Sequence, residues 1–160
     1  MGVTKTTYIF SALVIAFSAF ALAPAAGAAG KNSTVAGLLQ AVNHTREAHG
    51  LRPLRIDPAL ARAARSHSDE MLRGNYFSHG DFHGRMLAFA VHGPEVGENL
   101  AWGNGSYADT SAIIAEWLAS PAHRANLLHA GWTRIGIGIA IGTFLGNGGS
   151  AVVTADFAGS

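Results

Sequence analysis

The sequence contains no cysteine among its 160 residues. Without cysteine the chain can form no disulfide bond, no thiolate metal site and no thiol nucleophile, and it cannot carry a lipid-modified N-terminal cysteine. A chain of this length can nevertheless bury enough apolar surface to fold as one domain. We therefore expect a fold that the hydrophobic core stabilises without disulfides or a structural metal.

Charge of either sign is scarce, with 11 Lys and Arg against 10 Asp and Glu. There is no basic run and no interleaving of basic and aromatic residues, which argues against a nucleic-acid partner or a polybasic membrane surface. The sequence also lacks H-E-x-x-H, G-x-S-x-G, P-loop and G-x-G-x-x-G motifs. Common classes of metalloprotease, serine hydrolase and nucleotide-binding protein are therefore disfavoured.

The first 28 residues have the three regions of a secretory signal peptide. Lys5 precedes an apolar run over 8–23, and small residues follow at Ala26-Gly27-Ala28. An uncleaved anchor is the alternative, but this run is shorter than the roughly 20 residues that span a bilayer. We predict a secreted protein, extracellular or periplasmic, with no stable membrane span after cleavage. The predicted organisation is a signal peptide over 1–28, a short linker over 29–33 and a single domain over 34–160.

Apolar periodicity and capping signals predict the elements of this domain. Asp57-Pro58 and Ser120-Pro121 each combine a capping residue with a proline at the first helical position. The predicted helices are about 34–49, 58–74, 109–118 and a short one from Pro121. Alternation with period two predicts strands at 135–142 and 151–157, with 142–150 as a Gly-rich hairpin connection and a third strand at 98–102. The segment 78–97 is expected to be mostly loop, with a short helical piece within 85–91.

Four polar residues stand where an apolar pattern meets a turn: His79, Glu98, Glu116 and His123. Two imidazoles and two carboxylates can form a divalent-metal site or a general acid/base pair. From the residues alone, the simpler interpretation is favoured, in which Glu116 lies on the solvated side of a helix and His79 is a capping residue. The sequence by itself does not bring the four together.

Other histidines have simpler explanations or weaker patterns. His67 lies on the apolar face of the helix over 58–74, which is typical of a hydrogen-bonded core histidine. The trio His79, Asp81 and His83 is a rival ligand cluster, but its spacing matches no zinc pattern. His123 lies near a helix N-terminus, which disfavours imidazolium and should lower its pKa.

Several motifs occur together and in order along residues 34–158, and the chain resembles the bacterial CAP domain through them. This superfamily includes cysteine-rich secretory proteins, insect venom antigens and plant pathogenesis-related proteins. The motifs are Asn43-x-x-Arg46, Gly50-Leu51-x-Pro53-Leu54, His67-Ser68, Phe77-Ser78-His79, Gly97-Glu98-Asn99-Leu100, Glu116-Trp117, Ser120-Pro121-x-His123-Arg124-x-Asn126-Leu127-Leu128, Ile135-Gly136-Ile137-Gly138 and Asp156-Phe157.

The resemblance implies an α+β fold, an α-β-α sandwich with a small central antiparallel sheet between helical layers. It also implies a site of two histidines and two glutamates, which fall on His79, Glu98, Glu116 and His123 of this sequence. In the family the two histidines can hold zinc or another divalent metal ion. His79 and His123 are therefore the candidate metal ligands, and Glu98 and Glu116 are the candidate catalytic carboxylates.

Membership of such a family does not settle activity. Three functions stay open. The first is a monomeric, metal-dependent binding module for a lipid or cell-envelope ligand. The second is a metal-assisted, protease-like hydrolase in which Glu98 or Glu116 activates a water molecule. The third is a structural envelope protein with a vestigial site.

Overall fold

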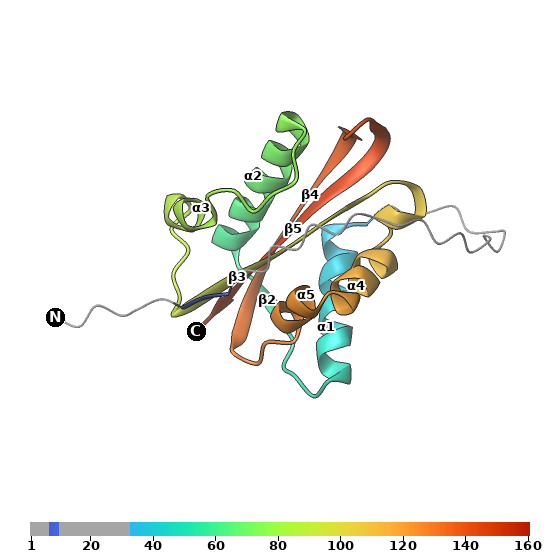
Figure 1. Ribbon diagram of the computed structural model, residues 1–160. Coiled ribbons are helices and arrows are strands. Elements are labelled where there is room, and N and C mark those ends of the chain that lie inside the picture. The colour runs from blue at the N-terminus through green and yellow to red at the C-terminus, as the bar shows by residue number, and fades with distance from the viewer. Residues whose placement is uncertain (1–6, 10–32) are drawn as a thin grey trace.

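The computed structural model describes residues 7–9 and 33–160, in which helices lie on both sides of a five-stranded sheet (Figure 1). The helices are α1 (Val35–Ala48), α2 (Pro58–Gly74), α3 (Phe82–Ala88), α4 (Thr110–Ala119) and α5 (Pro121–Leu127), with a 3-10 turn η1 (Gly105–Ala108). The strands are β1 (Thr7–Ile9), β2 (Arg55–Ile56), β3 (Glu95–Gly103), β4 (Trp132–Phe144) and β5 (Asn147–Gly159). The predicted α+β class is confirmed.

The sheet has the strand order β1-β3-β5-β4-β2. The three long strands β3, β5 and β4 pair antiparallel, as predicted, whereas the short outer strands β1 and β2 pair in parallel with β3 and β4. Strand β1 falls in the predicted signal peptide, so the other four strands belong to the predicted domain. The cleavage point after Ala28 lies outside the described residues, as does most of the linker over 29–33.

The helices form two layers. Helices α2 and α3 lie on one side of the sheet, and α1, α4 and α5 lie on the other (Figure 1). This arrangement is the sandwich that the resemblance implied. In the described ranges, no helix is both long and apolar enough to cross a membrane.

Strand β4 separates the two layers through its alternating residues. Ile135, Ile137 and Ile139 are buried in the core that faces α1, α4 and α5. Gly136 and Gly138 point to the opposite face, where the backbone of α2 lies so close that a Cβ atom on either glycine would overlap it. The sequence pattern of isoleucine and glycine therefore creates one face for side-chain packing and one face for a helix at close range.

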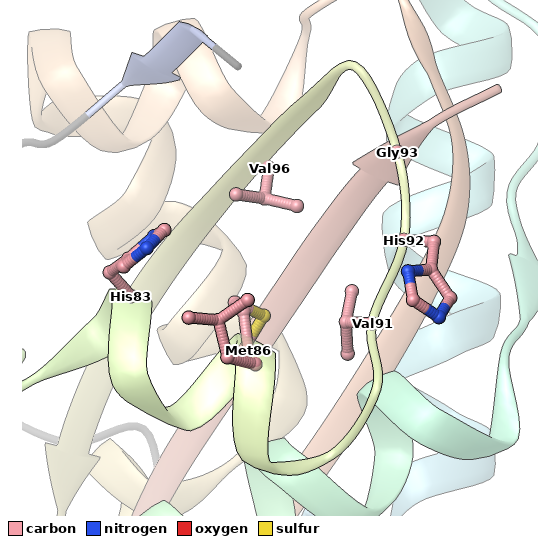
Figure 2. A pocket seen from close by; sticks show the side chains of 7 residues that line it. His83, Met86, Val91, His92, Gly93 and Val96 are labelled. Atoms are coloured by element: carbon pink, nitrogen blue, oxygen red, sulfur yellow. The ribbon is translucent and has the colours of Figure 1, made fainter. Parts of the chain in front are cut away.

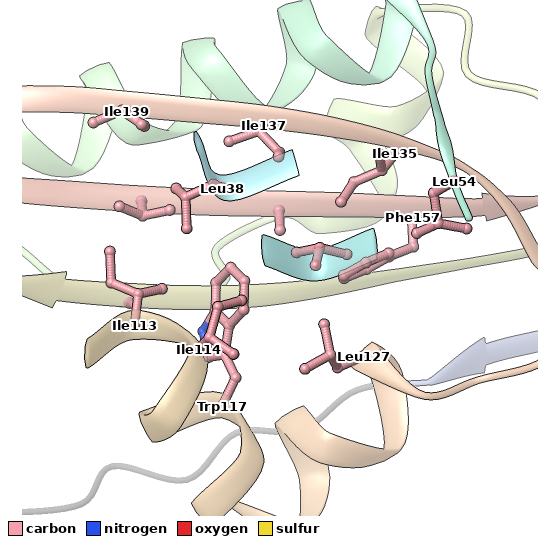
Figure 3. Close-up of a cluster of buried hydrophobic side chains, with 14 of the residues drawn as sticks. Leu38, Leu54, Ile113, Ile114, Trp117, Leu127, Ile135, Ile137, Ile139 and Phe157 are labelled. Carbon is pink, nitrogen blue, oxygen red and sulfur yellow. The ribbon is translucent and has the colours of Figure 1, made fainter. Parts of the chain in front are cut away.

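The main core lies between the sheet and the α1, α4 and α5 layer (Figure 3). Ile113, Ile114 and Trp117 of α4 enter it, as their spacing predicted. Trp117 is fully buried, and its indole N–H donates a 3.0 Å hydrogen bond to the main-chain oxygen of Leu100 on β3. This bond ties α4 to the strand that carries Glu98.

Two motif residues of α1 hold the chain that follows it. The side chain of Asn43 accepts a hydrogen bond from the main-chain nitrogen of Leu54 and donates one to its main-chain oxygen, at 2.7 and 3.0 Å. Arg46 is fully buried and donates to the main-chain oxygens of Leu127, the last residue of α5, and of His129, just beyond it. These bonds fix α5, and with it His123, against α1.

The bounds of two predicted elements were wrong. The short helical piece expected within 85–91 is helix α3, which starts earlier, at Phe82, because the side chain of Asp81 caps it through the main-chain nitrogen of Gly84 at 2.8 Å. The hairpin connection is much shorter than 142–150, since the turn consists of Leu145 and Gly146, both with positive φ. Such a turn matches the twist of paired strands, so the neighbouring glycines continue β4 and β5.

The close contact of α2 with β4 predicts a large effect of one methyl group. We expect Gly136→Ala to destabilise the protein by more than about 2 kcal/mol, because its Cβ meets the backbone of Leu60 and Ala61 rather than a movable side chain. The matched control is Gly148→Ala in β5, where no atom lies within 4 Å of the added Cβ. Urea unfolding measures both, and equal midpoints for the two variants would contradict the packing described for α2.

Candidate functional site

Glu98 is the centre of the site. It lies on β3 with its side chain only 1% exposed, directed to the sheet face that α2 and α3 cover. One carboxylate oxygen is 2.6 Å from Nδ1 of His79, and the other forms an ion pair with the guanidinium of Arg85. Arg85 also donates to the main-chain oxygen of His79 at 3.2 Å. The three residues thus form a closed network of hydrogen bonds.

Sequence reasoning missed Arg85, which it treated only as part of a short helical piece. A local signal was present, because Arg85 lies on the same face of α3 as the buried residues Phe82 and Met86. A cation on an apolar helix face needs a partner of opposite charge. The identity of that partner, Glu98, became visible only in the folded chain.

The loop that carries His79 is held from α2. Helix α2 ends at Asn75, which has a left-handed conformation. Nε2 of His67 is 2.9 Å from the main-chain oxygen of Ser78, the residue before His79. Burial lowers the pKa of His67, so its ring is neutral and donates this bond. The prediction of a hydrogen-bonded core histidine at position 67 is confirmed, and this residue also orients the site.

His123 approaches the site from the other layer. His123 is only 8% exposed, and its main-chain oxygen accepts a hydrogen bond from the side chain of Asn99 at 2.9 Å. Asn126, one turn further along α5, donates to the main-chain oxygen of Glu98 at 3.0 Å. Two adjacent residues of β3 therefore position the two histidines: Glu98 contacts His79 from the α2 and α3 layer, and Asn99 contacts His123 from the other layer.

The electrostatics of His123 favour a neutral ring. Burial lowers its pKa, and the charge of His79 lowers it further. The direction agrees with the prediction, but the cause is burial and a neighbouring imidazole rather than the helix end. Nδ1 of His123 is buried and has no hydrogen-bond partner among the described residues.

Glu116 is half-buried on α4, beside Trp117. It is therefore not on a fully solvated helix face, and burial raises the pKa of its carboxyl group to about 7. Within the described part of the chain, its side chain makes no hydrogen bond or ion pair with His79, Glu98 or His123. A carboxyl group with this pKa can exchange a proton near neutral pH.

The structure joins two of the four predicted residues directly, His79 and Glu98, and brings His123 within electrostatic reach of His79. In residues 7–9 and 33–160, no group of three or more Cys, His, Asp or Glu side chains is placed to hold one metal ion. The rival trio of His79, Asp81 and His83 is therefore no such group, and Asp81 instead caps α3.

A separate hollow of about 180 Å³ lies beyond α3 (Figure 2). It is lined by residues of α3, of the connection to β3 and of β3 itself: His83, Met86, Leu87, Val91, His92, Gly93 and Val96. None of the four predicted site residues lines it. Val96 nevertheless shares with Glu98 one face of β3, so the hollow and the network around Glu98 are neighbours on the same side of the sheet.

The fold agrees with comparisons to known proteins. Residues 39–157 match the cysteine-rich secretory protein family, CAP, and the chain belongs to this family. It is 33% identical over 106 residues to the uncharacterised protein YkwD of Bacillus subtilis and 36% identical over 107 residues to the uncharacterised membrane protein YlbC of the same organism. These matches cover 63% and 64% of the chain, but only 40% and 30% of the two relatives.

Solved structures show the same fold. An extracellular protein containing an SCP domain, from Bacillus anthracis, matches 77% of this chain with 30% identity and a TM-score of 0.66, over 39% of its own length. An outer surface protein of Borrelia burgdorferi matches 82% of this chain and 99% of its own with a TM-score of 0.64. Its 20% identity supports the fold alone. The predicted family and fold are confirmed.

The raised pKa of Glu116 predicts a pH-dependent stability. Between the usual pKa near 4.5 and the folded value of about 7, an unfolded chain ionises this carboxyl while the folded chain keeps it protonated. Wild type should therefore lose stability relative to Glu116→Gln as pH rises through this window, by about 1–3 kcal/mol. Urea unfolding from pH 4 to 8 measures the difference.

The matched control is Glu47→Gln, at an exposed position of α1. Its stability relative to wild type should stay constant across the same range. A constant difference for Glu116→Gln as well would show that the Glu116 carboxyl ionises as it does in water.

Proposed function

We propose that this chain is the CAP domain of a secreted protein and that its His79 and His123 site binds a lipid or cell-envelope ligand with the help of a divalent ion. Secretion is supported by the signal-like residues 1–28 and by the 30% identical SCP-domain protein of Bacillus anthracis, which is described as extracellular. The observation that carries the site is the buried ring of His123, whose pKa burial lowers and whose Nδ1 has no hydrogen-bond partner in the described part of the chain, beside a His79 held by Glu98.

The donor set fits zinc or another ion that binds imidazole, and fits calcium and magnesium poorly. Glu98 accepts a hydrogen bond from Nδ1 of His79, so Nε2 is the nitrogen of that ring that would bind the ion. Two protein ligands hold an ion weakly, and water or the ligand must complete its coordination. When bound, such an ion acts as a Lewis acid toward an oxygen of the ligand.

An apolar part of the ligand has a place nearby. The hollow beyond α3 is lined by Met86, Leu87, Val91 and Val96 and lies on the same side of the sheet as Glu98. A ligand with a polar head at the His79 and His123 site and a short apolar portion in the hollow matches this arrangement. This supports an amphipathic envelope component over a purely polar metabolite.

Zinc titration by calorimetry tests the site. In the double variant His79→Ala/His123→Ala, affinity should fall by about tenfold or more, whereas His83→Ala/His92→Ala, which removes two exposed imidazoles, should bind zinc as wild type does. Affinity should also decline below about pH 6.5, where imidazole becomes protonated. The lowered pKa of His123 shifts its share of that decline to lower pH. Equal zinc binding by both double variants would refute the site.

A metal-assisted hydrolase is the second candidate, and the pKa of Glu116 favours it. Both oxygens of Glu98 are engaged by His79 and Arg85, so Glu116 is the better proton acceptor for a water molecule. Turnover of a fluorogenic peptide library by the zinc-loaded domain distinguishes the two. A hydrolase shows turnover that rises through pH 7 and is lost in Glu116→Gln, whereas a binding module shows none.

A further inference from the structure

Asp156 is a fully buried carboxyl group that the proposed function does not use. It lies on the central strand β5, directly opposite Glu98 on β3 and Gly136 on β4. Cross-strand partners point to the same face of a sheet, so Asp156 and Glu98 share the face that α2 and α3 cover. At Gly136 this face carries no side chain, and α2 lies directly against it.

The charged groups that face Asp156 are Glu98 from β3 and Arg85 from α3. Arg85 already donates to Glu98 and to the main-chain oxygen of His79. From α2, His67 faces the same charges, but its ring is neutral and its Nε2 is bonded to the main chain. No donor in the described part of the chain gives a hydrogen bond to either carboxyl oxygen of Asp156.

Glu98 and Asp156 are direct cross-strand partners on one covered face, and such partners have Cβ atoms about 4.5–5.5 Å apart, so their carboxyl groups are neighbours. Two ionised carboxylates in such contact would repel each other, and neither could donate a hydrogen bond. One proton shared by the pair removes the repulsion and supplies the missing donor. Because Glu98 receives hydrogen bonds from His79 and Arg85, the negative charge lies on Glu98 and the proton lies on Asp156.

We propose that Asp156 is a positioning residue of the site, which keeps its proton and donates a hydrogen bond to Glu98. Glu98 is then fixed by three donors from three elements: Asp156 on β5, Arg85 on α3 and His79 in the loop after α2. The carboxylate of Glu98 in turn holds the N–H at Nδ1 of His79. This inference goes beyond the proposed function and holds whether or not the site binds a metal ion.

The electrostatic environment agrees with this geometry. Burial raises the pKa of Asp156 well above its usual range, and the charge of Glu98 raises it further, while Arg85 opposes the shift. The folded protein therefore binds a proton at Asp156 that the unfolded chain releases above about pH 3.9. Stability from this group is present at low pH and is lost as pH rises toward the pKa of the folded state.

The first test is NMR of the metal-free protein with ¹⁵N-labelled histidine at pH 7. Wild type and Asp156→Asn, which keeps a donor, should both show a slowly exchanging proton on Nδ1 of His79. Asp156→Leu, which has similar size but no donor, should lose that signal. The Nε2 proton of His67 should remain in all three and reports that the loop is folded. Retention of the His79 signal in Asp156→Leu, or its loss in Asp156→Asn, would overturn the proposal.

A second measurement decides the matter if Asp156→Leu does not fold. Urea unfolding of wild type and Asp156→Asn is compared from pH 4 to 8. If Asp156 keeps its proton in the folded state, the unfolding constant of wild type should rise relative to that of Asp156→Asn by up to about tenfold per pH unit. A ratio that stays constant over this range means that Asp156 is ionised in the folded protein, and the proposal fails.

Discussion

The contact between α2 and the glycine-lined face of β4 is the constraint on which the rest of the site depends. Gly136 and Gly138 let the helix backbone lie directly on the strand, so the distance and direction of α2 are set by main-chain contact. The end of α2 then determines the loop that follows it. His67, a buried residue of that helix, forms a hydrogen bond with the main-chain oxygen just before His79. The position of His79 beside Glu98 thus follows from the absence of two side chains on β4.

The buried carboxylate of Glu98 imposes a second constraint, which is electrostatic. A carboxylate buried to this extent is costly unless donors surround it, and removal of one donor leaves an uncompensated charge. The donors come from separate elements, namely Arg85 on α3 and His79 after α2. A single buried charge therefore requires both of these elements to occupy one arrangement, which links the local geometry of the site to the stability of the whole layer.

The two glutamates of the candidate site have different environments, and this supports a different proposed role for each. Glu98 is enclosed by donors, and we assign it to orientation of His79. Glu116 has no such partners in the described part of the chain, and burial alone raises the pKa of its carboxyl to about 7. Carboxyl pairs whose environments differ in this way are typical of sites where one group holds charge and the other exchanges protons. The family assignment does not distinguish the two, but the contacts do.

The sequence by itself determined most elements, because caps, prolines and the period of apolar residues act over a few positions, and the motifs shared with the family supplied the four candidate site residues. Asp57-Pro58 and Ser120-Pro121 located two helix starts, and Ile135–Ile141 located a strand. The tertiary structure alone decided the partners: Arg85 with Glu98, which are 13 residues apart, and Asp156 opposite Glu98 across the sheet. Strand register and helix packing create such contacts between distant residues, and no local pattern records which buried charge will meet which donor.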